Sequence, residues 1–396
     1  MTFGAGAESV SPQLIRLGDC EDGCERGSDP GERCFLDHFA DLPDPRQLSK
    51  VVYPLDEILL LSLLAVLAGA ETFTAIAQFG KDKLDLLRGL RRFANGAPDH
   101  DRLGEVFAAL DAERFQKCFV AWMAALTGVP ADVIAIDGKT SRRSGTKGGA
   151  NPIHMVSAFA ARQRLVLGQI KVAEKSNEIV AIPKLLDMLA IEGAVVTIDA
   201  MGCQRQIAAK IIDKKADYVL ALKGNQGTLR EDVELFANEQ NAKDFKDCTV
   251  SQNKTVDGDH GRIETRRTTV FHDIGWLRER HDWPGLKGVV MVESERQIDA
   301  KLERETRFYV TSSTDKADKL ADIVRRHWSV ESMHWLMDCL FRDDECRVRT
   351  EHAAANFTTI KHIAHNLLRR HPAKLSMTNK RLKAGWNERF LLSLIS

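Results

Sequence analysis

The sequence predicts an α/β protein: a mixed sheet flanked by helices, with an N-terminal helical domain and a mainly β insertion. Three observations support this class. Residues 54–127 carry apolar residues at helical spacing, residues 132–224 alternate short β-branched runs with helical segments, and residues 225–305 contain strand-like segments of weaker regularity. The length of 396 residues and a hydrophobic content of 44% are typical of about two or three globular domains.

Charge, hydropathy and cysteine usage exclude several classes of protein. The 56 basic and 56 acidic side chains exclude a histone-like polycation, although a local basic face would still bind phosphates. The longest apolar stretch, residues 58–70, is shorter than the roughly 20 residues that cross a bilayer. The N-terminus lacks a basic segment followed by an apolar block, so we expect neither a secretory signal nor a membrane partner. Eight scattered cysteines without a CxxC motif indicate reduced thiols in a cytoplasm.

The first part of the chain divides into a tail and a helical domain. Residues 1–33 are rich in Gly, Asp, Glu and Ser, which predicts a flexible tail. Residues 34–129 form the helical domain, with Thr72 and Asp99 as expected N-caps. Its helices are expected at 54–69, 71–90, 100–110 and 111–127.

The remaining residues divide into three segments. Residues 130–224 are expected to give strands at 132–138, 154–161, 164–172, 194–202 and 217–224, with helices at 177–190 and 203–215. Residues 225–305 are the insertion, with a charged helix at 228–241 and strand-like runs at 262–273 and 288–297. Residues 306–396 contain the last strand, one long helix at 315–341, further helices to about 370 and a basic tail.

Two carboxylates stand where a ligand crevice is expected. Asp137 and Asp199 each lie at the C-terminal end of an apolar strand, and in open α/β sheets these ends face the ligand. If the two strands are neighbours, the carboxylates repel unless a cation lies between them, and Mg²⁺ prefers such oxygen ligands. The alternative is that each aspartate only caps the turn that follows it.

A polar stripe on the last long helix adds a third element. His327, Glu331, His334 and Asp338 fall within an arc of about 60° on one helix face. Apolar residues border this arc on both sides, which is typical of a helix that packs on a sheet while offering a carboxylate to a site. Two alternatives remain open: a buried polar ladder that satisfies itself, and a zinc site from the two histidines and the glutamate.

These residues lie within a longer series of matching segments. The chain resembles the DDE transposases of bacterial insertion sequences, in the ISAs-type group that includes the H-repeat-associated proteins. The resemblance runs in order from about residue 36 to about residue 370. The matching segments are DHFADLPDPRQ, YPLDEILLLSLLAVLAGAETFTAIAQFG, IAIDGKTSRRS, HMVSAF, KVAEKSNEI, TIDAMGCQ, DYVLALKGNQ, HGRIETR, RRHWSVESMHW and FRDDECRVR.

The resemblance implies a ribonuclease-H-like catalytic fold with Asp137, Asp199 and Glu331 as its acidic triad. It implies a transposase that cuts and joins insertion-sequence ends by two-metal phosphoryl transfer. Asp137 would bridge two Mg²⁺ ions, for which Mn²⁺ is a possible substitute, while Asp199 and Glu331 would each hold one. The implied partners are double-stranded DNA, as inverted-repeat ends and as target, and a second copy of the chain in a homodimeric paired-end complex. The implied location is the cytoplasm, in association with the nucleoid.

One departure from broader relatives changes which DNA contacts are expected. Those relatives carry Tyr, Arg, Glu and Lys where this chain has Val324, His327, Glu331 and Asp338, so phosphate contacts of that Arg and Lys do not carry over. Here His327 and His334 are expected to orient Glu331 or a metal-bound water, and Asp338 is expected to support the metal ligands in the same way.

Other residues are expected to contact DNA. Lys139, Arg142 and Arg143 directly follow Asp137 and would hold the phosphate backbone, unless they form an ordinary solvated loop. Three residues at the end of the strand expected at 217–224, and just after it, are expected to line the same crevice: Lys223, Asn225 and Gln226.

The sequence leaves two rival functions open. One is a catalytically silent protein that binds transposon ends, and the other is a metal-dependent nuclease that cuts DNA without joining it. The helical domain would either read DNA ends or only pack against the catalytic part.

Overall fold

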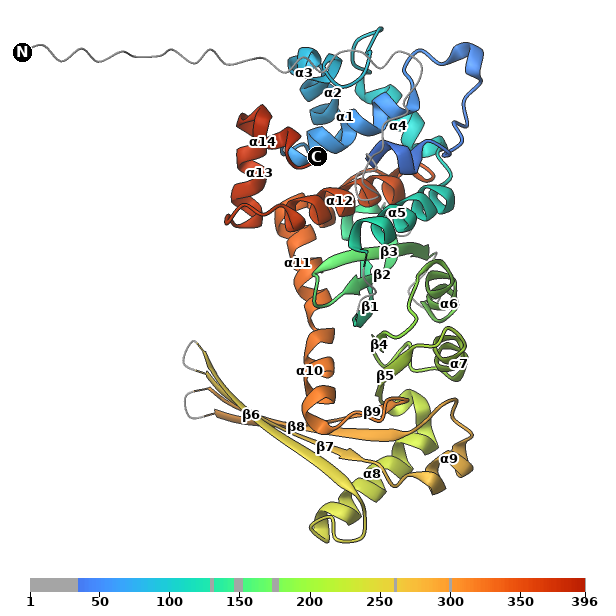
Figure 1. The fold of residues 1–396 in the computed structure, drawn as a ribbon, viewed down its shortest axis with the longest axis vertical. Helices are drawn as coiled ribbons and strands as arrows, with labels where there is room; N and C mark the ends of the chain where they lie inside the picture. Colours follow the sequence, from blue (N-terminus) through green and yellow to red (C-terminus); the bar gives the residue numbers. More distant parts are fainter. Residues whose placement is uncertain are drawn as a thin grey trace, which may run out of the picture.

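The computed structural model describes residues 35–128, 132–145, 152–172, 178–259, 262–298 and 301–395 (Figure 1). The predicted tail and the predicted boundary at residues 129–130 lie outside these ranges. The helices are α1 Leu55–Leu67, α2 Phe73–Asp82, α3 Leu84–Arg88, α4 His100–Ala109, α5 Ala112–Thr127, α6 Glu178–Met188, α7 Arg205–Asp213, α8 Gly227–Ala242, α9 Gly275–His281, α10 Ala317–His327, α11 Ser329–Phe341, α12 Ala353–Arg370, α13 Met377–Trp386 and α14 Glu388–Leu392. The strands are β1 Val133–Thr140, β2 His154–Ala160, β3 Leu165–Val172, β4 Val195–Ile198, β5 Asp217–Leu222, β6 Val250–Asp259, β7 Arg262–Phe271, β8 Gly288–Ile298 and β9 Lys301–Thr311.

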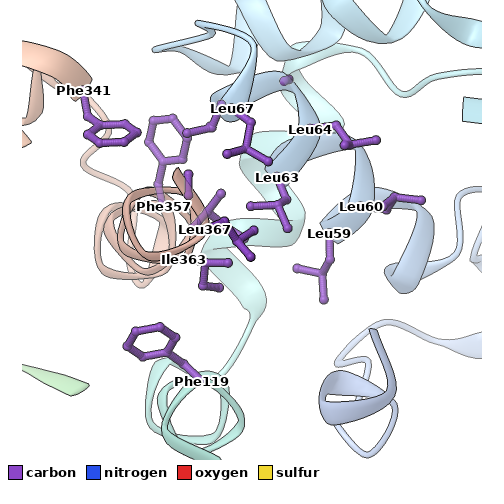
Figure 2. Packing of buried hydrophobic residues seen from close by; sticks show 14 of the residues in the cluster. Leu59, Leu60, Leu63, Leu64, Leu67, Phe119, Phe341, Phe357, Ile363 and Leu367 are labelled. Carbon is purple, nitrogen blue, oxygen red and sulfur yellow. The ribbon is translucent and has the colours of Figure 1, made fainter. Parts of the chain in front are cut away.

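The N-terminal helices form a bundle around α1, which is apolar on nearly every side and is buried. Both predicted N-caps are confirmed: the Thr72 hydroxyl accepts from the Ala75 N–H at 3.1 Å, and the Asp99 carboxylate accepts from the Arg102 N–H at 2.8 Å. The helix predicted at 71–90 is instead two helices, α2 and α3, because the backbone leaves the helical region at Lys83. Figure 2 shows α1 leucines meeting apolar side chains of α12.

A single mixed sheet of nine strands runs through the molecule in the order β3-β2-β1-β4-β5-β9-β8-β7-β6. The strands β1, β4 and β5 are parallel to one another, whereas the other neighbouring pairs are antiparallel. The predicted mixed α/β architecture is therefore confirmed. The strands of the insertion extend the same sheet, and β9 crosses the boundary predicted at residue 305 as one continuous strand.

Alternate residues of β1 pack against different helices, and this alternation decides which side chains reach the site. Ile134 and Ile136 lie in the apolar cluster with α6 and α7. Val133 packs in a cluster with α10, and Ala135 belongs to the core that contains α11 and α12. Asp137 has the same parity as Val133 and Ala135, so its side chain lies on the face of the sheet that α10 and α11 cover.

The last quarter of the chain differs from prediction in two ways. The single helix predicted at 315–341 is broken at Trp328, whose N–H bonds to the Arg326 carbonyl, and the chain continues as α11. The predicted basic tail contains the helices α13 and α14, and two of its basic residues are buried. Lys380 donates to the carbonyls of Leu368 and His371, and Arg381 donates to the Val66 carbonyl. Within the described residues, the helices include none that is long and apolar enough to span a membrane.

Candidate active site

Asp137 and Asp199 follow paired residues of two neighbouring parallel strands. In the β1–β4 pairing, Ile136 is opposite Ile198, and the next residue of the chain in each case is one of the two aspartates. Asp199 directly follows β4, whereas β1 continues past Asp137 to Thr140, so the strand end predicted at Asp137 lies further along the chain. Thr197 precedes Asp199 by two positions, and its hydroxyl lies 3.0 Å from His327 Nδ1 at the end of α10. Since side chains two positions apart share a face, both carboxylates lie on the side covered by α10 and α11.

Two histidines, one before and one after Glu331 in the sequence, contact the strands β4 and β1. His327, four residues before Glu331, contacts Thr197 on β4, and His334, three residues after it, has Nδ1 at 3.5 Å from Asp137 Oδ2 on β1. The junction of α10 and α11 is therefore held against β4 and β1, the two strands that position Asp199 and Asp137. This arrangement brings the three predicted acids to one region of the structure.

The pKa of Asp137 is consistent with a position close to Asp199 and Glu331. Burial raises the pKa of Asp137 to about 7, and the nearby charges of Asp199, Glu178 and Glu331 contribute to the rise. Burial also lowers the pKa of His334 to about 4, so near neutral pH its contact with Asp137 is that of a neutral imidazole. The acids repel one another without a protonated histidine to neutralise them.

The donor chemistry of this cluster fits a hard divalent cation. Carboxylate oxygens from separate elements are the ligands that Mg²⁺ prefers, and a bound cation would relieve the repulsion that raises the pKa of Asp137. In the part of the chain that the structure describes, the side chains do not form a ready-made group of three His, Cys, Asp or Glu ligands. The alternative of a zinc site on the Glu331 helix likewise finds no such group among these residues.

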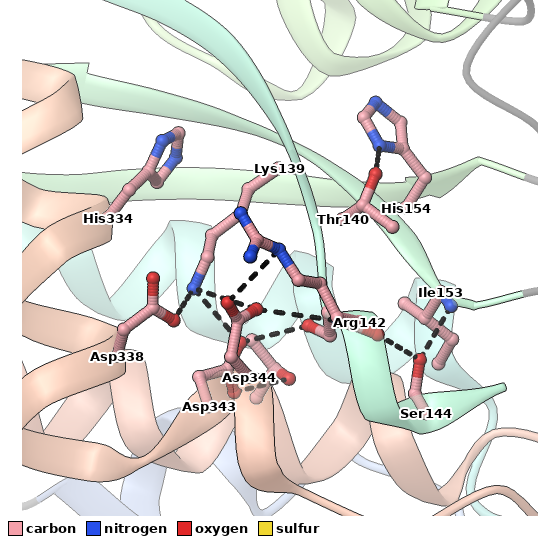
Figure 3. A network of polar contacts seen from close by, with 12 residues as sticks. Lys139, Thr140, Arg142, Ser144, Ile153, His154, His334, Asp338, Asp343 and Asp344 are labelled. Carbon is pink, nitrogen blue, oxygen red and sulfur yellow. Dashed lines mark hydrogen bonds and ion pairs between the residues drawn. The ribbon is translucent and has the colours of Figure 1, made fainter.

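Lys139 is held by a cluster of acidic side chains at the end of α11 (Figure 3). Its ammonium contacts Asp338 and lies 3.7 Å from Asp343 and 3.9 Å from Asp344. Because Asp137 and Lys139 lie on the same face of β1, the strand meets α11 at two successive turns, through His334 and then through Asp338. Lys139 thus links β1 to the Glu331 helix.

Asp343 is the buried centre of this cluster. It accepts from the Ser141 hydroxyl at 3.0 Å and from Lys361 at 2.9 Å. Burial by itself would raise the pKa of Asp343, but the ammonium groups of Lys361 and Lys139 hold that pKa well below its usual range. Asp343 and Lys361 were not predicted from the sequence, because they lie 18 residues apart and neither follows a strand end.

The other predicted DNA-contact residues occupy different environments. Arg142 and Arg143 are exposed on the short helical turn after β1, with Arg142 Nε 3.6 Å from Asp344. Lys223 is exposed and lies in a hollow shared with Arg230 and Arg307.

Asn225 and Gln226 support the loop that follows Asp199. Asn225 donates to the Ala200 carbonyl and Gln226 donates to the Cys203 carbonyl, each at 2.6 Å. Within that loop, Asp199 Oδ1 accepts from the backbone N–H groups of Met201 and Gly202 at 3.1 and 3.3 Å. The two amides therefore brace the turn that presents Asp199.

Comparison with known proteins gives the class to which this fold and site belong. The family described as the transposase DDE domain matches residues 129–367, and a family described as DDE_Tnp_1-associated matches residues 36–123. The chain therefore belongs to the DDE transposase family, and the predicted resemblance is confirmed.

Several known proteins are similar to this chain over most of its length. The H repeat-associated protein YhhI of Escherichia coli K12, which its name assigns provisionally to the transposases, is 39% identical over 373 residues, covering 91% of this chain and 97% of that one. The protein YbfL of the same strain is 38% identical over 371 residues, with the same coverage. A solved piggyBac transposase synaptic complex with hairpin DNA has a TM-score of 0.40 at 11% identity, covering 89% of this chain and 74% of that one.

Proposed function

We propose that this chain is a DNA transposase that cuts and joins insertion-sequence ends by divalent-metal-dependent phosphoryl transfer. Its family membership supports the class of activity. The strand order β3-β2-β1-β4-β5, in which β2 and β3 run against the three parallel strands, supports a ribonuclease-H-like catalytic core. The observation that carries the proposal is that His327 and His334, which precede and follow Glu331, contact Thr197 on β4 and Asp137 on β1.

In this proposal the three acids hold two Mg²⁺ ions, or Mn²⁺ in their place. The carboxylate oxygens of Asp137, Asp199 and Glu331 would hold these ions. Bound there, the ions supply Lewis-acid activation of the attacking water or 3′-hydroxyl and stabilise the charge that develops on the leaving 3′ oxygen.

The surrounding residues of the chain position these ligands. His334 stays neutral beside Asp137, so it brings no positive charge that would compete with a cation for this carboxylate. The contact of His327 with Thr197 fixes the end of α10, from which α11 starts. The exposed Arg142 and Arg143 are the side chains that we assign to the DNA backbone near the cut.

The experiment uses the full chain and duplex DNA that carries each boundary of its own element, with Mg²⁺ and a target plasmid. Wild-type protein is expected to cut the boundary DNA and to join the 3′ end to the plasmid. Glu331→Gln and Asp137→Asn are expected to lose both activities by at least about 100-fold, since each removes a charged ligand. Glu345→Gln, at an acid of the turn after α11, is the matched control and should retain both activities.

Each rival function gives a different result in this assay. Cutting without joined products would identify a nuclease, and binding without cutting would identify a silent end-binding protein. Wild-type cutting by Glu331→Gln would refute the assignment of the triad. We also expect a dimer when two ends are bound, because two ends must be joined together, and sedimentation of the DNA complex would measure it.

A further inference from the structure

A buried acid–histidine pair lies directly behind β1, on the face opposite Asp137. Glu178, the first residue of α6, is 4% exposed, and His154 on β2 is 2% exposed. Glu178 Oε1 lies 2.6 Å from His154 Nε2. The other ring nitrogen of His154 lies 2.8 Å from the Thr140 hydroxyl, a contact that Figure 3 shows. His154 thus holds the carboxylate in one place from the far side of the strand.

The pair packs against the backbone one residue beyond Asp137. A Cβ atom on Gly138 would lie 2.4 Å from Glu178 Oε1 and 2.6 Å from His154 Nε2, both closer than real contacts allow. Only glycine leaves room for the pair at this position. Glu178 therefore reaches the part of β1 that carries Asp137.

The carboxyl group of Glu178 lies against Gly138, the residue next to Asp137, so the two acids are close enough to interact electrostatically. After burial, the interactions that raise the pKa of Asp137 include repulsion from Glu178 together with that from Asp199 and Glu331. A buried charge is screened less than a charge in water, so its field extends across the strand. On the other face, Lys139 is held by its own acidic cluster.

We infer that Glu178, held by His154, supplies a fourth carboxylate charge that strengthens the binding of a divalent cation between Asp137, Asp199 and Glu331. This inference rests on the proposed function, because it assumes that these three acids hold the cation. Glu178 acts through its field from behind β1 and is a positioning residue rather than a ligand.

The test measures binding of Mn²⁺ alone to the full chain, without DNA, by calorimetry and by electron paramagnetic resonance. Glu178→Gln is expected to weaken Mn²⁺ binding by about fivefold, because one negative charge near the cation is removed while the side-chain shape is kept. The matched control is Asp232→Asn, which neutralises a half-buried acid that is also paired with a histidine: Asp232 Oδ2 on α8 lies 2.7 Å from His281 Nε2 on α9, and 3.0 Å from Arg280 Nε. This control should bind Mn²⁺ as the wild type does.

A second variant separates charge from structural support. His154→Gln removes the histidine but leaves the Glu178 charge, so we expect Mn²⁺ affinity equal to or higher than that of the wild type. Weaker binding by His154→Gln, or unchanged binding by a folded Glu178→Gln, would overturn the inference. If Glu178→Gln does not fold, the His154→Gln result decides alone. Absence of Mn²⁺ binding by the wild type would instead refute the proposed metal site itself.

Discussion

Asn366 joins the helical bundle to the edge of the sheet, and its replacement by leucine tests how strongly the two parts are coupled. Asn366 is fully buried on α12, and its amide faces β3, the edge strand. Its Oδ1 accepts from the Val166 N–H at 2.9 Å and its Nδ2 donates to the Val166 carbonyl at 2.8 Å. The side chain thus pairs with the strand as a further strand would.

The magnitude follows from the two backbone groups that leucine leaves behind. Asn366→Leu keeps the approximate side-chain volume but leaves the N–H and the carbonyl of Val166 buried without partners. Each such group costs about 1–3 kcal/mol, so the free energy of unfolding should fall by about 2–6 kcal/mol. Urea denaturation followed by circular dichroism measures this change, and hydrogen exchange at the Val166 amide should become faster.

The matched control is the same substitution, asparagine to leucine, at an exposed position. Asn95 also donates to a backbone carbonyl, that of Val52 at 2.7 Å, but it lies at the surface. Because water can replace its hydrogen bond, Asn95→Leu should change stability by less than about 0.5 kcal/mol. Equal effects of the two substitutions, or an Asn366→Leu effect below about 1 kcal/mol, would refute the view that the amide closes the sheet edge.

Three other predictions concern the site and its supports. Lys139→Met should lower the free energy of unfolding by about 2–4 kcal/mol, because the mostly buried lysine interacts with several acids, among them the buried Asp343. Asp338→Asn should lower it by less than about 1 kcal/mol, because Asp338 is more exposed. Thermal denaturation measures both changes, and the reverse order would refute this account. Asn225→Ala should leave stability within about 1 kcal/mol of wild type but speed hydrogen exchange in the loop after Asp199, and unchanged exchange would show that the amide does not brace it. Burial lowers the pKa of His362 to about 3 and that of His365 to about 4, so the unfolded chain takes up these two protons first as pH falls. The contribution of the two neutral histidines to stability is complete above about pH 6.5, and below it the free energy of unfolding should fall by up to about 1.4 kcal/mol per pH unit per histidine. His365→Gln should reduce that slope in urea denaturation measured between about pH 6 and about pH 4.5.

The elements that could be predicted from sequence are those whose signals are local. The N-caps at Thr72 and Asp99 need only the next three residues, and both form. The apolar runs that end in Asp137 and Asp199 predicted buried strands, and the strands pair as neighbours. Such patterns depend on short sequence windows, so these elements could be predicted without knowing the contacts that the rest of the chain makes.

The features that were missed depend on contacts between distant residues. Periodicity across 315–341 continues through Trp328, so the pattern by itself predicted one helix there. Helix α12 buries polar residues along with apolar ones, including Lys361 and Asn366, because their partners Asp343 and Val166 come from other elements. A sequence pattern does not contain these partners, since burial of a polar group is decided by what lies opposite it in space.

The position of Glu331 depends on the register of β9 against β5. The chain returns from the insertion along β9, pairs Val219 with Thr311, and enters α10 six residues later. Side-chain hydrogen bonds fix this register: the Thr311 hydroxyl donates to the Tyr218 carbonyl at 2.7 Å, and the Ser312 hydroxyl donates to Asp217 at 2.7 Å.

A slip of one residue in that pairing would exchange the two faces of β9. Phe308 and Val310 would leave the core that they share with α7 and α8, and Tyr309 would take their side. The start of α10 would move along the sheet by about 3.3 Å, the rise of one strand residue. Because His327 must still reach Thr197 at the end of this helix, such a slip would remove the anchor that holds Glu331 over the two aspartates. The insertion can therefore vary in its outer strands, whereas the last four residues of β9 must keep their register for the acids to meet.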